Sequence, residues 1–179
     1  MSHPHEPQPA KLITGLLFRD FDIRRSVLAA LQDRFGPMDC LTEPNLFTYT
    51  DYYDSEMGEG IYRQTLSFTE LVFPEKLADI KLFTNELELR LSLDGKRQAN
   101  IDPGLLSEER VVLATGKNYT HRIYLRDGIY ADLTLIYQAG AYQTLPWTYP
   151  DYGEKGVREM FHKIRMKYVM QLKGNGLMR

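Results

Sequence analysis

The sequence predicts an α+β protein with a ferredoxin-like (βαββαβ) antiparallel sheet, followed by a C-terminal β-hairpin and helix extension. One observation is the order of strand and helix patterns over residues 11–102, which runs strand, helix, strand, strand, helix, strand. The other is Asp127–Gly128, a two-residue hairpin signal between two strand-like segments. We expect a flexible tail at 1–10 and a single domain at 11–179, with the ferredoxin-like core at 11–102 and the extension at 103–179.

The composition of the chain favours a globular protein and argues against several other classes. The 179 residues include 43% hydrophobic and 26% charged residues, close to the average of globular domains. The net charge of −2 argues against a nucleic-acid binder. A single cysteine, Cys40, fits a reducing compartment. The polar, proline-rich start is not a signal peptide, and no apolar run approaches the roughly 20 residues of a membrane span, so we expect a cytoplasmic protein without membrane contact.

The first strand and helix have clear local signals. Lys11–Phe18 is a short apolar run, typical of a buried strand. Apolar residues at helical spacing then predict a helix over Ile23–Phe35, capped by Asp20 or Asp22. Gly36, followed by a proline, predicts the end of this helix.

The next elements repeat the pattern. Asn45–Tyr53 has strand-like aromatic residues, and Ile61–Phe68 alternates as a strand. Pro74 opens a second helix, whose buried stripe consists of Leu77, Ile80, Phe83, Leu87 and Leu91, with Lys76, Asp79, Lys81, Glu86 and Arg90 largely outside. A strand over Lys96–Ile101 follows and leads into a short acidic turn at Asn100–Gly104.

The extension begins with an apolar strand at Val111–Thr115. The turn at Asp127–Gly128 predicts that Arg126 faces Ile129, Tyr124 faces Ala131 and Arg122 faces Leu133, which places His121 and Asp132 on one face and within reach of each other. A long aromatic loop at 140–153 precedes a last helix at Gly156–Lys173.

Five segments together resemble a known family over nearly the whole chain after the tail. They are YTDYYDSEMG (49–58), ADIKLFTNELE (78–88), NIDPG (100–104), the run from Lys117 to Tyr130, and LPWTYPDY (145–152). In order and spacing they resemble the prokaryotic domain of unknown function 4416 family. The resemblance implies no activity, although some members carry the label of a GTP-binding protein.

The motifs of nucleotide and metal sites are missing from the sequence. A phosphate-binding loop needs a first glycine where Val111 stands, and a hydroxyl where Asn118 follows Gly116–Lys117. No guanine-reading Asn-Lys-x-Asp segment and no Cys/His spacing of a zinc site is present. The sequence therefore predicts no metal site and names no cofactor, and GTP binding would have to occur without a P-loop.

The hairpin is the best candidate for catalysis. A histidine beside an aspartate can act as an oriented general base, which makes His121 and Asp132 candidate catalytic residues. Asp102 could supply a second carboxylate, and Arg122 or Lys117 an anion clamp. The alternative is that His121 and Asp132 form a structural pair on a half-exposed strand.

Aromatic segments flank this cluster and suggest ligand contacts. Aromatic rings with a few carboxylates suit stacking on a sugar or a base, and they equally suit a packing layer or an interface. The candidate ligand-binding residues are Asp51, Asn100, Arg122, Tyr124, Trp147, Tyr149 and Asp151.

The expected role is binding, or also processing, of a small polar or phosphorylated ligand at this Asp/His/Arg cluster. One alternative is a non-enzymatic protein-interaction module with an aromatic surface. The basic and aromatic side chains around Lys117 could contact RNA, but neighbouring Asp127 and Asp132 weaken that patch. The sequence specifies neither the ligand nor the oligomeric state.

Overall fold

The computed structural model describes residues 1 and 3–177, and it confirms the α+β class, with 34% helix and 35% strand. The strands are β1 (Ala10–Phe18), β2 (Met38–Leu41), β3 (Asn45–Leu46), β4 (Tyr62–Val72), β5 (Ala99–Leu106), β6 (Arg110–Thr115), β7 (Arg122–Arg126), β8 (Ile129–Gln138) and β9 (Ala141–Thr144). The helices are α1 (Phe21–Phe35), α2 (Asp54–Met57), the 3-10 turn η1 (Pro74–Lys76), α3 (Leu77–Arg90), α4 (Pro150–Gly153) and α5 (Lys155–Gly174).

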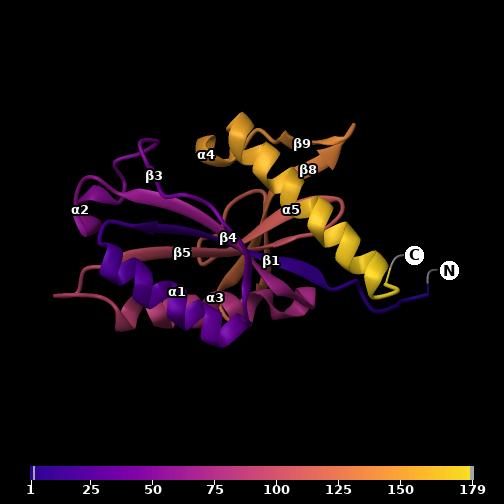
Figure 1. Cartoon of the computed structure of the whole chain (residues 1–179), viewed down its shortest axis with the longest axis horizontal. Helices are drawn as coiled ribbons and strands as arrows, with labels where there is room; N and C mark the ends of the chain where they lie inside the picture. The colour runs from indigo at the N-terminus through magenta and orange to yellow at the C-terminus, as the bar shows by residue number, and fades with distance from the viewer. Residues whose placement is uncertain (2, 178–179) are drawn as a thin grey trace.

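All the strands belong to one antiparallel sheet with the order β2-β4-β1-β5-β6-β8-β7. The short strand β3 pairs with β4, and β9 pairs with β8. Helices α1 and α3 cover one face of the sheet, and α5 lies on the opposite face (Figure 1). Within the described residues, no helix has the length and the apolar character needed to cross a membrane.

Strand β1 lies at the centre of the sheet and is buried on both faces, as its unbroken apolar sequence predicts. Leu12 and Leu16 pack into the core beneath α1 and α3. Ile13 points the other way and packs with Phe161 and Tyr168 of α5. This alternation is the period of two of a β-strand, and helices on both faces explain why both sets of positions are apolar.

The predicted end of the first helix and its cap at Asp20 are confirmed, and the helix begins two residues before the predicted Ile23, at Phe21. The side chain of Asp20 accepts hydrogen bonds from the amides of Asp22 and Ile23, at 2.6 and 3.3 Å. Gly36 follows the last turn with φ of 83°, a conformation that glycine adopts without steric cost. One prediction in the next segment is wrong, since only Asn45 and Leu46 form a strand there and the aromatic residues after them lie in a loop before α2.

The acidic turn predicted at Asn100–Gly104 is also wrong, because these residues lie inside β5. They pair with β1 along their whole length, and Asp102 stands opposite Gly15. Pairing with β6 begins only at Gly104 and covers three residues of β5. Pro103 is tolerated because this edge of β5 is unpaired up to that point. The boundary between core and extension drawn after Asp102 therefore falls within a strand.

The hairpin turn and the predicted pair of Arg126 with Ile129 are confirmed, but the predicted register beyond this pair is wrong. Asp127 and Gly128 have φ of 51° and 75°, the two positive values of the tight hairpin turn expected for this sequence. An irregularity at Leu125 inserts one residue into β7, so that Arg122 pairs with Asp132 and not with Leu133. Tyr124 correspondingly faces Tyr130 in place of Ala131.

Candidate functional site

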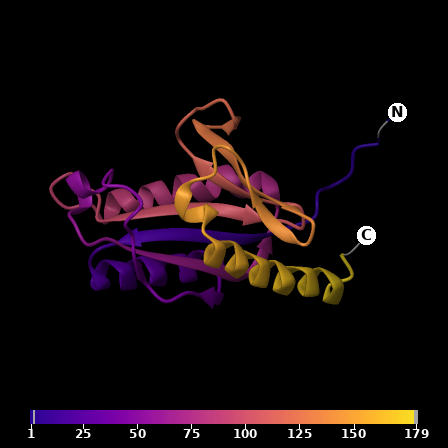
Figure 2. The same ribbon diagram turned by 90° about the horizontal axis from the view of Figure 1, so that it is seen from above.

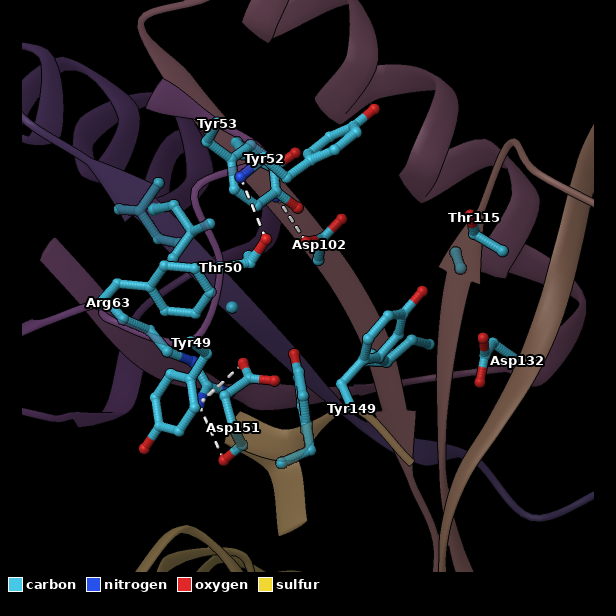
Figure 3. Close-up of a pocket in the computed structure, with 18 of the residues that line it drawn as sticks. Tyr49, Thr50, Tyr52, Tyr53, Arg63, Asp102, Thr115, Asp132, Tyr149 and Asp151 are labelled. Atoms are coloured by element: carbon cyan, nitrogen blue, oxygen red, sulfur yellow. Dashed lines mark hydrogen bonds and ion pairs between the residues drawn. The ribbon is translucent and has the colours of Figure 1, made fainter. Parts of the chain in front are cut away.

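A cavity of about 630 Å³ opens where β5 and β6 diverge. Figure 2 shows the β7–β8 hairpin, in orange, turning away from β1 and β5. Because β6 pairs with β5 at three residues only, the first half of β5 is free to line the cavity. Its other walls come from β1, β4, β6, β8 and α3, from the loop before α2 and from the segment around α4. Figure 3 shows side chains that line the cavity.

Asp102 is held in the wall of the cavity by two neighbours. Asn100 donates a hydrogen bond from Nδ2 to Asp102 Oδ2 at 2.5 Å. Lys81 Nζ lies 3.3 Å from Asp102 Oδ1 and donates to the carbonyl oxygen of Ile101 at 2.8 Å. The expected exposed position of Lys81 is wrong, since only 6% of the residue is accessible. Its ammonium group is buried because a carboxylate and a carbonyl replace water as hydrogen-bond partners.

A second charged group lies beside Asn100. Arg97 donates from Nη1 to Asn100 Oδ1 at 2.8 Å and from Nη2 to Glu56 Oε2 at 2.6 Å. Buried Glu88 accepts the amide hydrogen of Ile101 at 2.6 Å and lies 3.5 Å from Arg97 Nη1. Burial raises the pKa of Glu88, against the opposing effect of the nearby cations.

Asp132 lines the cavity from β8 and is fixed by two basic side chains. Arg122 Nε donates to Asp132 Oδ2 at 2.8 Å, and His121 Nε2 lies 3.2 Å from the same oxygen. The His121 ring stacks on Trp147 with centroids 4.8 Å apart, and its Nδ1 has no hydrogen-bond partner within the described residues. Of these three residues, Asp132 lines the cavity, and His121 and Arg122 lie outside its wall and contact Asp132.

Asp151 forms a third pair, with Arg63 of β4. Arg63 Nη1 lies 3.1 Å from Asp151 Oδ2 and 3.2 Å from its carbonyl oxygen. The guanidinium group of Arg63 stacks over the ring of Tyr152 at 4.5 Å. Burial raises the pKa of Asp151, although Arg63 opposes the shift. Arg63 Nη2 is buried and has no hydrogen-bond partner in the described part of the chain.

Tyrosine rings supply much of the remaining wall. The aromatic residues that line the cavity are Phe47, Tyr49, Tyr52, Tyr53, Tyr149 and Tyr152. Arg122 Nη2 donates to the hydroxyl of Tyr149 at 2.6 Å, which places this ring between Asp151 and Asp132 (Figure 3). Burial raises the pKa of Tyr53 and of Tyr149. At the open end, Lys117 Nζ lies 2.9 Å from the Tyr52 hydroxyl and lowers its pKa.

The residues predicted from the sequence divide into two sets. Asn100, Asp102, Asp132, Tyr149 and Asp151 line the cavity, although they come from three separate parts of the chain. The rest do not belong to its wall: His121 and Arg122 contact Asp132, Trp147 stacks on His121, Asp51 is exposed beside α2, and Tyr124 is exposed on β7.

Four charged residues of the wall were not among the predicted site residues: Arg63, Lys81, Glu88 and Arg97. A signal existed for two of them, since Lys81 follows Ile80 and Glu88 follows Leu87, each next to the apolar stripe of α3. No arrangement of three or more His, Cys, Asp or Glu side chains able to hold a metal ion occurs in residues 1 and 3–177. The chemistry of this wall is therefore that of paired carboxylates and cations, amides and phenols.

Comparison with known proteins gives one match. A family model, described as a domain of unknown function (DUF4416), matches residues 8–168. Searches of the curated proteins and of the solved structures found no significant match. The matched range includes every residue of the cavity wall.

Proposed function

Because the chain belongs to the DUF4416 family, a family of unknown function, we propose a function from its own geometry: the protein binds a small polar ligand in the cavity between β5 and β6. The observation that supports this proposal is that polar residues from distant parts of the chain converge on the cavity. Five polar residues chosen from the sequence come from three parts of the chain and meet in one concave wall. A concave site with a few convergent polar groups and groups of shifted pKa is the usual form of a ligand site.

The site also has the groups needed for acid–base chemistry. Asp102 and Asp132 both line the cavity, and each is held by a basic side chain. We assign Asp102 and Asp132 as the residues that would accept or donate protons if the ligand is processed. His121 has the supporting role of positioning Asp132, because it contacts Asp132 Oδ2 and is not part of the cavity wall.

A thermal-shift screen tests the proposal. The panel contains sugars, nucleosides, sugar phosphates, nucleotides and small carboxylic acids. A ligand at a hundred times its Kd stabilises the folded state by about 2.7 kcal/mol, which corresponds to a rise in Tm of about 5–10 °C for a chain of this size. Asp102→Asn should reduce the shift by about half or more, because a tenfold larger Kd leaves about 1.4 kcal/mol of stabilisation. Asp51→Asn, which changes an exposed residue outside the wall, should preserve the full shift. A shift that Asp102→Asn leaves undiminished would refute the cavity as the binding site.

We also infer that residues 10–106 form a ferredoxin-like unit. The sheet order β2-β4-β1-β5 supports this inference, with α1 between β1 and β2 and α3 between β4 and β5. The antiparallel pairing of all neighbouring strands agrees with it. We further propose a cytoplasmic location, supported by the unpaired thiol of Cys40.

A second candidate function is protein interaction through β7. This strand lies at the end of the sheet, and Ile123 and Tyr124 on it are 71% and 57% exposed. Tyr119, just before the strand, is 64% exposed. An exposed edge with apolar side chains is a site for pairing with another chain. Analytical ultracentrifugation and a pull-down with Ile123→Lys as the control would test this role independently of the cavity.

A further inference from the structure

We propose that the ligand of this cavity is a neutral polyhydroxylated compound, namely a sugar or the sugar of a nucleoside, rather than an anion such as a phosphate ester. This inference depends on the proposed function, because it names the chemical class of ligand for the same site. Three features carry it: the balance of charge in the wall, the pairing of hydrogen-bond donors with acceptors, and the tyrosine rings.

The charges of the wall balance, and three of its four cations are already neutralised. The wall contains four cationic residues, Arg63, Lys81, Arg97 and Lys117, and four carboxylates, Glu88, Asp102, Asp132 and Asp151. Arg63 pairs with Asp151, Lys81 with Asp102, and Arg97 with both Glu88 and Glu56.

A phosphate that entered this site would have to compete with a carboxylate for each of these three cations. It would also have to approach the carboxylates themselves, and like charges repel. Lys117 is different, because it is exposed and its partner is the neutral hydroxyl of Tyr52. One exposed ammonium group at the rim gives little binding energy for an anion.

Hydroxyl groups match the wall better than anions do. A hydroxyl both donates and accepts a hydrogen bond, and each charged pair of the wall offers an acceptor beside a donor. Around Asp102 the carboxylate oxygens lie next to the amide of Asn100 and the ammonium group of Lys81. A carboxylate accepts the hydrogens of sugar hydroxyls, as acidic residues do with ribose in dinucleotide sites.

The tyrosine rings of the wall also suit a sugar or a nucleoside. Tyr49, Tyr53 and Tyr149 present apolar faces with polar edges to the same cavity as the carboxylates. Such faces pack against the C–H surface of a sugar ring or stack on a base. The volume of about 630 Å³ lies within the range of small-molecule sites and leaves room for a nucleoside or a sugar of one or two rings.

Matched pairs of neutral and phosphorylated probes test the inference. Binding is measured by saturation-transfer NMR and calorimetry for glucose, galactose, mannose and N-acetylglucosamine, and for adenosine, guanosine, cytidine and uridine. Each is compared with its phosphate ester. We expect at least one neutral compound to bind as tightly as its ester or more tightly. Its affinity should change less than about twofold between low and high salt, because no net charge is neutralised. Comparison of the pyranoses with the nucleosides shows whether the ligand is a free sugar or a nucleoside.

Two variants locate the contacts. Asp102→Asn should weaken binding of the neutral compound about tenfold or more, the size of a lost hydrogen bond to a charged group. Asp51→Asn changes an exposed residue outside the wall, and it should leave the affinity within about twofold. If Asp102→Asn fails to fold, Tyr49→Ala serves in its place. Tyr49 is 41% exposed, and loss of its ring should weaken binding about fivefold or more.

The outcomes separate this inference from the proposed function. A phosphate ester that binds tenfold more tightly than its neutral parent, and that loses this advantage in salt or in Lys117→Ala, overturns the inference and leaves ligand binding intact. Absence of binding by every neutral probe at millimolar concentration also overturns it. Binding that is indifferent to both Asp102→Asn and Tyr49→Ala refutes the cavity itself, and the proposed function with it.

Discussion

Gly104→Ala tests whether the close approach of β5 to β6 closes one end of the cavity. A Cβ atom at residue 104 would lie 2.6 Å from the carbonyl oxygen of Val112 and 2.7 Å from Cδ2 of Leu113. Both distances are shorter than any normal contact, and one of them is to backbone that cannot rotate away. The two strands would have to separate where only three residues of β5 pair with β6.

The cost follows from this geometry. Overpacking of this kind costs about 1–3 kcal/mol, and the backbone contact favours the upper end of that range. The alanine also lowers the conformational entropy of the unfolded chain, which stabilises the folded state by about 0.5 kcal/mol. We expect a net loss of about 2 kcal/mol in the free energy of unfolding, equivalent to a fall in Tm of about 4–8 °C.

Urea denaturation followed by circular dichroism measures this loss, with calorimetry for Tm. Gly116→Ala is the matched control, because residue 116 follows β6 and a Cβ there meets nothing within 4 Å. The control should stay within about 0.5 kcal/mol of the wild type. A Gly104→Ala protein as stable as the control would refute the tight β5–β6 contact and, with it, the stated shape of the cavity.

Three further predictions concern charge and backbone conformation. Lys81→Met should lower the free energy of unfolding by about 2 kcal/mol in urea denaturation, because it leaves the half-buried Asp102 without its cation. Lys76→Met, an exposed change five residues earlier, should have no measurable effect. Glu88→Gln should alter the pH dependence of stability. Burial raises the folded pKa of Glu88 above its ordinary 4.5, so the wild type loses stability as pH rises from 4.5 through that raised value, and the variant should lack this loss; parallel stability curves for the two proteins would contradict the burial effect. Gly128→Ala should cost about 1 kcal/mol, because residue 128 has φ of 75° and nothing within 4 Å, which makes the cost purely conformational; an unchanged Tm would contradict it.

Local signals in the sequence were sufficient for several elements. The apolar run at Lys11–Phe18 and the helix over Ile23–Phe35, with its cap and stop, depend on neighbouring residues only, and the structure confirms both. The segment Asn100–Gly104 shows the limit of such signals. Pro103 and Gly104 favour a turn locally, but pairing with β1 supplies hydrogen bonds along the whole segment, so that tertiary contacts override the local preference.

The register of the hairpin could not be predicted for a different reason. The irregularity at Leu125 has no residue type that marks it, and it shifts every later pair by one position. Arg122 consequently pairs with Asp132 and not with the predicted Leu133. The predicted closeness of His121 and Asp132 holds all the same, because His121 precedes β7 and lies next to the residue that pairs with Asp132.

The polar residues that gather in short segments of the sequence were predictable as site residues, and the charged residues on regular elements elsewhere were missed. Asn100, Asp102 and Asp151 belong to polar segments that are conspicuous in the sequence. Arg63, the partner of Asp151, lies on a strand far away in the sequence, where a single charged residue has the appearance of an ordinary surface position. Lys81, the partner of Asp102, gave only the weak signal of its place beside the apolar stripe of α3. Only the three-dimensional arrangement shows these two pairs.

Trp147 gives this protein a built-in optical probe. It is the one tryptophan in the sequence, and its indole stacks on His121 and donates from Nε1 to the carbonyl oxygen of Leu133 at 2.7 Å. Leu133 is the neighbour of Asp132 along β8, so the indole is hydrogen-bonded to the residue next to one that lines the cavity. Tryptophan fluorescence, excited selectively over the 12 tyrosines, therefore reports on this single location without a label, and a titration can follow changes beside Asp132 in real time.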